Sequence, residues 1–272
     1  MVRGERPASG GVRRGIYQEN PGDRDIMILL ANDTIGYHAG SSLTSLNFKI
    51  LLDEQKAEYR ILKCPSFIEN RKSWDDEKLE GIESIIINGE GTFHHNTAGA
   101  EYIYRLAVKA KAKGIKVSLI NTTIDGIGYD LSIFDNIYCR EVLSAGGRYP
   151  VVPDLCFYNG NKKKNRQEGE YTLVTDGMID PNKFIQIAGS TPNSIYTSMI
   201  QWKDIYDFCR IVSRAKKIIS GRYHGVVFAL MYGIPFEWYH SHTHKIVGLV
   251  DTVRDVEDID QGLYPEMIRA CL

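Results

Sequence analysis

The chain has 272 residues, of which 43% are hydrophobic, which is enough for one large α/β domain or two small ones. It carries 33 Lys and Arg against 34 Asp and Glu, so its net charge of -1 gives no argument for binding nucleic acid or an anionic membrane. The longest apolar run, from Val226 to Tyr232, is far shorter than the roughly 20 residues that span a bilayer.

The N-terminal stretch and the cysteines indicate the compartment. Residues 1–22 are basic and rich in glycine, and they lack the apolar segment of a signal peptide, so we expect a disordered tail there. Five cysteines are scattered along the chain without a CxxC pair, which is typical of a reducing compartment. We therefore expect a cytoplasmic protein.

Short apolar runs alternate with amphipathic stretches in the first half of the chain. The pattern predicts a helix that begins at a Ser41 cap and a second helix that ends at Gly114. Buried strands are expected at 25–32, 59–62, 84–88 and 116–121. Strands that alternate with helices form a parallel sheet, so we expect a Rossmann-like domain over 23–158.

A hydrophilic segment, NGNKKKNRQEGE at 159–170, has no apolar residue to bury and is predicted to be a linker. Beyond it the alternation resumes, with strands expected at 171–175, 183–188 and 216–220 and helices expected within 202–215 and from 221 onward. The predicted fold class is therefore α/β, with two Rossmann-like domains, 23–158 and 171–272, that face a central cleft.

The stretch SGRYHGVVFAL, from Ser220, joins a predicted strand to a predicted helix through a glycine turn. Parallel sheets bind ligands beyond the carboxyl ends of their strands, and the free N–H groups of a first helical turn favour an anion. Gly221 and Gly225 would let the backbone approach that anion, Arg222 could grip it and His224 could donate a hydrogen bond or a proton. Alternatively, the glycines only relieve packing and Arg222 forms a surface ion pair.

Two further strand ends carry candidate side chains. NGEGTFHH places Glu90 where it could act as a general base, with His94 and His95 nearby to bind a sugar. A Glu90 that merely begins a helix is an equal alternative. ANDTIGYHAGSS places Asp33 and His38 after the first strand, where Asp33 could be the base instead, or simply a turn former.

The segment HSHTHK sets His240, His242 and His244 at alternate positions, so an extended strand would present all three on one face and could ligate zinc. Unliganded imidazoles in a cleft loop are the favoured interpretation, because structural zinc sites usually draw their ligands from separated segments. The sequence contains no Walker loop, HExxH or GxSxG motif. We expect neither a metal nor a cofactor.

Four separated segments together resemble one family, the polysaccharide pyruvyl transferases. GRYHGVVFALMYGIPF resembles the family's R-x-H-G signature with its following A-x-x-x-G-x-P, and CREVLSAGG followed by VVPDLCF resembles its R-E-x-x-S and PD segment. IINGEGTFHH resembles the family's glycine-rich strand and turn, and THKIVGLVD resembles the segment after the signature. The four span roughly Asn88 to Asp251 in the family's order.

This resemblance implies a GT-B-like architecture and transfer of enolpyruvate from phosphoenolpyruvate to a sugar of a cell-surface polysaccharide. It also implies that Arg222 and His224 hold the phosphoenolpyruvate with Arg140 as a second cation, and it favours His244 or Lys245 near the phosphate. We expect the backbone at Gly221 to help neutralise the donor.

Three functions stay open at this point. The first is the pyruvyl transferase, with a saccharide acceptor bound by His38, His94 and His95 and activated by Glu90 or Asp33. A lipid-linked acceptor would bring such a protein to a membrane surface, and no nucleic acid is expected as a partner. The second is a GT-B-type glycosyltransferase with a nucleotide-sugar donor, and the third is a non-catalytic two-domain protein that closes on a ligand by a hinge.

Overall fold

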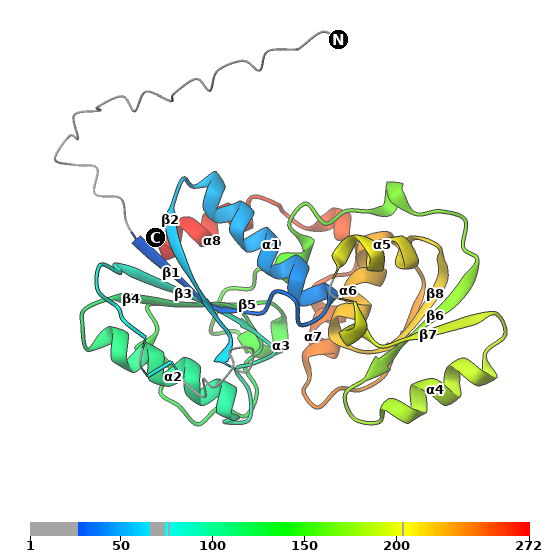
Figure 1. Cartoon of the computed structure of the whole chain (residues 1–272), viewed down its shortest axis with the longest axis horizontal. Coiled ribbons are helices and arrows are strands. Elements are labelled where there is room, and N and C mark those ends of the chain that lie inside the picture. The colour runs from blue at the N-terminus through cyan, green and yellow to red at the C-terminus, as the bar shows by residue number, and fades with distance from the viewer. Residues whose placement is uncertain (1–26, 66–73, 76, 203) are drawn as a thin grey trace, which may run out of the picture.

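The computed structural model describes residues 27–65, 74–75, 77–202 and 204–272. The expected tail at 1–22 lies outside these residues. Two parallel sheets lie side by side in two lobes, and helices cover both faces of each sheet (Figure 1). This arrangement confirms the predicted α/β class with two Rossmann-like sheets. Within the described residues, no helix has the length and apolar character needed to cross a bilayer.

The first lobe contains a sheet with the strand order β2-β1-β3-β4-β5, in which neighbouring strands are parallel. Its described strands are β1 (Met27–Asp33), β2 (Glu58–Lys63), β3 (Ser84–Glu90), β4 (Lys116–Thr122) and β5 (Asn136–Cys139). Helix α2 (Ala98–Lys111) covers one face, and α1 (Ala39–Glu54) and α8 (Leu263–Cys271) cover the other (Figure 1). The short helix α3 (Val142–Ala145) follows β5.

The second lobe contains a parallel sheet with the order β7-β6-β8-β9. Its described strands are β6 (Tyr171–Gly177), β7 (Ser194–Thr197), β8 (Ala215–Gly221) and β9 (Phe236–Trp238). Helix α4 (Pro181–Ser190) lies on one face, and α5 (Ile205–Ser213) and α6 (Tyr223–Tyr232) lie on the other. Helix α7 (Lys245–Thr252) contacts both α3 and α6, so it lies where the lobes meet.

One apolar core runs through both lobes. Phe48 and Leu51 of α1 belong to the same buried cluster as Phe208 of α5 and Val226 of α6. The C-terminal helix α8 returns to the first lobe, where the Ser84 hydroxyl donates a 2.8 Å hydrogen bond to the Cys271 carbonyl. The chain therefore crosses between the lobes twice, and the boundaries expected at 158 and 171 stay a prediction.

Two local predictions are wrong. Residues 183–188, expected as a strand, belong to helix α4, because Asp180 caps a helix that begins with a proline and its carboxylate accepts from the Lys183 N–H at 3.2 Å. Helix α1 begins before Ser41, because the N-cap is His38, whose Nδ1 accepts a 3.1 Å hydrogen bond from the Ser41 N–H. The expected strand over 84–88 and the helix after Ser220 are confirmed as β3 and α6.

Candidate active site

A cavity of about 690 Å³ opens where the two lobes meet. Its wall is built from residues that follow the carboxyl ends of strands in both sheets, which is where parallel sheets bind ligands. Eight of the residues singled out from sequence line it: Glu90, Arg140, Arg222, His224, Lys245, His38, His94 and His242. Four others, Asp33, Gly221, His95 and His244, do not line it.

Glu90 is a buried carboxylate on the cavity wall. Its two oxygens accept hydrogen bonds from the hydroxyls of Thr34 at 2.6 Å and Ser41 at 2.9 Å and from the Asn88 amide at 3.2 Å. Burial raises the pKa of this carboxyl group, although these hydroxyls and the Arg140 charge oppose the shift. A carboxylate with a raised pKa is a stronger base when it is ionised.

The backbone of Glu90 has a φ of 39°, which lies in the left-handed region that side chains other than glycine and asparagine avoid. The strand ends beside it in the sheet hold asparagines in the same region, Asn32 at 63° and Asn121 at 52°. Amides link the three ends, because Asn32 donates to the Asn88 carbonyl at 2.6 Å and Asn121 to the Asn88 side chain at 3.1 Å. This network holds Glu90 in a conformation that costs energy, as is typical of functional sites.

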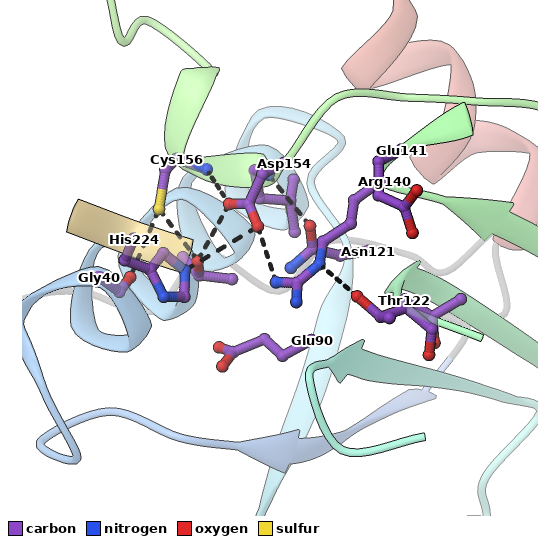
Figure 2. Close-up of polar contacts among 12 residues, drawn as sticks. Gly40, Glu90, Asn121, Thr122, Arg140, Glu141, Asp154, Cys156 and His224 are labelled. Carbon is purple, nitrogen blue, oxygen red and sulfur yellow. Dashed lines mark hydrogen bonds and ion pairs between the residues drawn. The ribbon is translucent and has the colours of Figure 1, made fainter. Parts of the chain in front are cut away.

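Arg140 is almost fully buried, with 1% of its surface exposed, and is held by its neighbours at three points. One terminal nitrogen lies 3.0 Å from the Asp154 carboxylate, Nε donates to the Thr123 hydroxyl at 2.9 Å, and the guanidinium lies 3.9 Å from the centre of the Tyr223 ring. Figure 2 shows the Asp154 carboxylate between Arg140 and His224. A fixed guanidinium of this kind binds an anion with little loss of side-chain entropy.

Asp154, Cys156 and His224 offer ligand atoms within 4.8 Å of one another, which is the spacing of a three-ligand metal site (Figure 2). The donor set does not fit a metal ion, because Asp154 already pairs with Arg140 and burial raises the pKa of the Cys156 thiol well above its usual range. The thiol instead lies 3.4 Å from the Gly40 carbonyl, as a weak hydrogen-bond donor. We interpret the cluster as support for Arg140 and His224.

Arg222 is the N-cap residue of α6 and reaches the cavity from the second lobe. Its guanidinium pairs with Asp176 at the end of β6, with Nε at 3.0 Å and a terminal nitrogen at 2.5 Å from one carboxylate oxygen. Gly221 does not face the cavity, because a Cβ there would lie 2.4 Å from the Phe184 ring and 2.7 Å from Gly177. This glycine lets β8 and β6 approach each other and so sets where α6 begins.

His224 is buried at the contact between the lobes. A Cβ added at Gly40 in α1 would lie 2.2 Å from the imidazole, so only a glycine permits this approach. Burial, followed by the charges of Arg140, Lys245 and Arg222, holds the pKa of His224 well below its usual range. His38 packs edge-on against it at 4.9 Å between ring centres, and burial likewise lowers the pKa of His38. Both rings are therefore neutral at pH 7.

Lys245, the first residue of α7, also lies on the cavity wall and is 8% exposed. Its ammonium and a terminal nitrogen of Arg140 both lie beside Gly91, 3.4 and 3.5 Å from the place where a Cβ would be. Burial, then the charges of Arg140 and Arg222, lowers the pKa of Lys245 to about 7. Three basic side chains, Arg140, Arg222 and Lys245, therefore line the same cavity as Glu90.

Four histidines lie in a chain around Asp125. His94 and His242 line the cavity with their Nε2 atoms 3.3 Å apart, and burial lowers the pKa of each to about 4. His95 and His244 lie 3.7 and 3.3 Å from the Asp125 carboxylate, outside the cavity. His240 packs against Trp238 instead, so the three histidines do not share one face, as the less favoured zinc-site interpretation would require.

Asp33 lies away from the cavity. It is 3% exposed, and one of its oxygens is 3.8 Å from the Lys49 ammonium. Of the two carboxylates considered from sequence, only Glu90 therefore faces the cavity.

The sequence reasoning missed several residues of this site. Asp176, Asp154 and Asp125 fix the cations and imidazoles, and Gly40 admits His224. A signal was present for two of them: Asp176 directly follows a predicted strand, and Asp154 follows a proline in a segment already singled out. Nothing local in the sequence marks Gly40.

Comparison with one solved structure supports the fold. The chain is similar to an uncharacterized protein from Klebsiella pneumoniae, with a TM-score of 0.54 and 13% identity over 83% of this chain and 87% of that one. An alpha-glucosyltransferase in complex with UDP and DNA aligns with a TM-score of 0.45 and 9% identity, over 91% of this chain and 94% of that one. No curated protein matches this chain.

The family is shown by sequence. Residues 38–238, well over half of the 272, match the family described as polysaccharide pyruvyl transferase. The matched range includes Glu90, Arg140 and the Arg222–His224 segment, all of which line the cavity. The chain belongs to the polysaccharide pyruvyl transferase family.

Proposed function

We propose that this chain transfers the enolpyruvyl group of phosphoenolpyruvate to a saccharide hydroxyl in the cavity between the lobes. The observation that carries the proposal is the set of three basic side chains, Arg140, Arg222 and Lys245, that line one cavity together with the buried carboxylate of Glu90. Phosphoenolpyruvate carries a phosphate and a carboxylate three atoms apart, so it is a compact anion that suits several cations on one wall.

In this proposal the donor lies at the N-terminus of α6. No side chain caps this terminus, and the N–H groups of Tyr223 and His224 have no hydrogen-bond acceptor among the residues that the structure describes. These two groups are available to an anion, and the helix dipole favours negative charge there. Arg222 and Arg140 each keep N–H groups beyond those that pair with Asp176 and Asp154, and the two carboxylates hold these donors in place. Such fixed donors stabilise the charge that develops on the leaving phosphate.

Glu90 is the proposed general base for the acceptor hydroxyl, and Asp33 is not, because only Glu90 faces the cavity. His224 is a neutral imidazole at pH 7, so we assign it a hydrogen bond to the donor rather than donation of a proton. The acceptor would occupy the side of the cavity formed by the first lobe, where His38 and His94 lie with Tyr37 and Tyr102. Aromatic faces of this kind pack against sugar rings.

Incubation with phosphoenolpyruvate and a panel of nucleotide-linked and lipid-linked saccharides tests the proposal. We expect phosphate release that requires an acceptor, together with a product whose mass has increased by a pyruvyl group. The Glu90→Gln variant should bind phosphoenolpyruvate but release little phosphate. Absence of phosphate release by the native protein with every acceptor would contradict the proposal.

The same samples separate the two rivals. Release of a nucleoside diphosphate from a nucleotide sugar, without turnover of phosphoenolpyruvate, would identify a glycosyltransferase. A protein that is stabilised by a ligand against thermal unfolding but turns over neither donor would be a binding protein.

A further inference from the structure

The side chain of Lys245 is buried on the wall of the cavity. Among the residues that the structure describes, none forms a hydrogen bond or an ion pair with its Nζ, although the side chain is 8% exposed. The two guanidinium groups of the cavity differ from it, because Arg140 pairs with Asp154 and Arg222 with Asp176. A buried charge without a partner is costly, so this position indicates an anionic ligand.

The groups around Lys245 disfavour its charge. Lys245 begins helix α7, where the helix dipole opposes a cation. The carboxylate packed against α7 at Gly248 is that of Glu141, and it accepts hydrogen bonds from N–H groups of α3 and not from Lys245. The titratable and charged side chains that act on Lys245 are Arg140, Arg222, Glu90, His38, His94, His224 and His242. Only Glu90 among them carries negative charge.

We propose that Lys245 is the proton carrier of this cavity: it takes up a proton when an anion binds beside it and later gives that proton to carbon 3 of the enolpyruvyl group. The second half of this inference rests on the proposed function. The position lies beyond the range 38–238 that matches the family, and the resemblance of the segment THKIVGLVD implies only that His244 or Lys245 lies near the phosphate, not that either carries a proton.

The other side chains on the wall are poor candidates for this role. His38, His94, His224 and His242 have lowered pKa values and are neutral at pH 7, and guanidinium groups do not release protons. Burial raises the pKa of Tyr223 well above its usual range. Lys245, with a pKa of about 7, can both gain and lose a proton under these conditions.

The transfer balances as follows. The Nζ–H bond breaks as the C=C electron pair of the donor forms a C–H bond at carbon 3, and carbon 2 becomes electrophilic. An acceptor oxygen bonds to carbon 2 while its proton passes to Glu90, and the C–O bond to phosphate breaks with its electron pair on the phosphate. Departure of the phosphate, which takes up the proton held by Glu90, leaves an oxocarbenium ion at carbon 2. A second acceptor hydroxyl bonds to this carbon and gives its proton to the neutral Lys245, which closes the ketal. The acceptor loses two hydroxyl protons, and two protons are gained, one by carbon 3 and one by the phosphate. Lys245 and Glu90 therefore return to the protonation states that they had in the donor complex.

Calorimetric titration of the full chain at pH 8.0, in two buffers of different ionisation enthalpy, tests the uptake step. Phosphoenolpyruvate is fully ionised at this pH, because the second pKa of a phosphate monoester is about 6. Sulfate is a second probe, because it has no proton to exchange in this range. With Lys245 mostly neutral before binding, we expect uptake of roughly 0.5–0.9 proton for each anion bound.

The Lys245→Arg variant keeps the charge but cannot lose it, so it should bind the anion with uptake near zero. Lys183→Arg, at an exposed lysine of α4 over the Tyr239 ring, is the matched control and should keep the native uptake. Equal uptake in the native protein and Lys245→Arg, or binding of neither anion by the native protein, would overturn the inference. If sulfate binds with proton uptake but phosphoenolpyruvate does not bind, the uptake step is supported and the proposed function is rejected.

Turnover tests the delivery step once an acceptor is found. Lys245→Arg should keep its affinity for phosphoenolpyruvate but lose roughly 100-fold or more in kcat. In Lys245→Ala, added ethylamine should restore part of the lost rate, because a free amine can replace a missing proton donor but not a missing structural contact. A Lys245→Arg variant with native kcat would reject delivery by this residue while leaving the proposed function intact.

Discussion

The contact between Gly40 and His224 gives the sharpest test of how the lobes form the site. An alanine at position 40 would place its Cβ 2.2 Å from the imidazole, so the ring or helix α1 must move by roughly 1 Å to reach an ordinary contact distance. Overpacking of this kind costs about 1–3 kcal/mol of unfolding free energy. The usual gain for Gly→Ala inside a helix is about 0.5–1 kcal/mol of the opposite sign.

We therefore expect Gly40→Ala to lower the free energy of unfolding by about 1 kcal/mol net, whereas helix propensity alone would raise it. Gly189→Ala is the matched control, because Gly189 lies in α4 with nothing within 4 Å of an added Cβ, and it should raise stability. Urea denaturation of both variants gives the two signs, and titration with phosphoenolpyruvate should show weaker binding to Gly40→Ala alone. A Gly40→Ala variant that is more stable than the native protein and binds the donor normally would refute this account of the site.

Three further predictions follow from the site. Glu90→Gln should lower kcat by roughly 10²–10⁴-fold with little change in donor affinity, whereas Asp33→Asn should leave kcat within about twofold of the native value. Steady-state kinetics of both variants tests this, and a large loss in Asp33→Asn with none in Glu90→Gln would contradict it. Asp176→Asn leaves the Arg222 charge uncompensated at a site only 12% exposed, so it should cost about 3 kcal/mol in urea denaturation, and an unchanged midpoint would speak against the pair. The cavity histidines have lowered pKa values in the folded protein, so below pH 6.5 the unfolded chain binds more protons than the folded one. The free energy of unfolding should therefore fall as the pH is lowered from 6.5 toward 4. Thermal unfolding across this range should show a smaller fall for His94→Gln than for the native protein.

Much of the fold follows from local sequence patterns. Continuous apolar runs predict the central strands β1, β3 and β4 and the strand β8, because each is buried on both faces and needs no information from distant residues. The short strands β5, β7 and β9 have three or four residues each, which is too few for a periodic signal. The apolar residues of helix α4 are also compatible with the alternation of a strand, and the Asp180 cap is the signal that distinguishes the two.

The candidate site was predictable where one motif carries the chemistry. The strand, glycine turn and helix at Ser220 place Arg222 and His224 on the cavity wall, and the strand end at Asn88 places Glu90 there. Residues that act by pairing across distant segments could not be predicted, because the partnership of Asp176 with Arg222 or of His94 with His242 exists only after the lobes have packed. The glycine turn at Gly221 was predictable, but its close contacts with Phe184 and Gly177 were not, because both residues lie far from Gly221 in the sequence.

The return of α8 to the first lobe has a consequence for any attempt to divide this protein. A fragment that ends before α8 would leave Met267 and Ile268 out of the common interior and would remove the carbonyl that Ser84 bonds. Expression of the halves as separate pieces should therefore give insoluble material, and heat or urea should melt the intact chain in a single step. A wide separation of the two lobes would expose apolar side chains of their shared core to water. Substrates must therefore enter through the opening that the cavity already has.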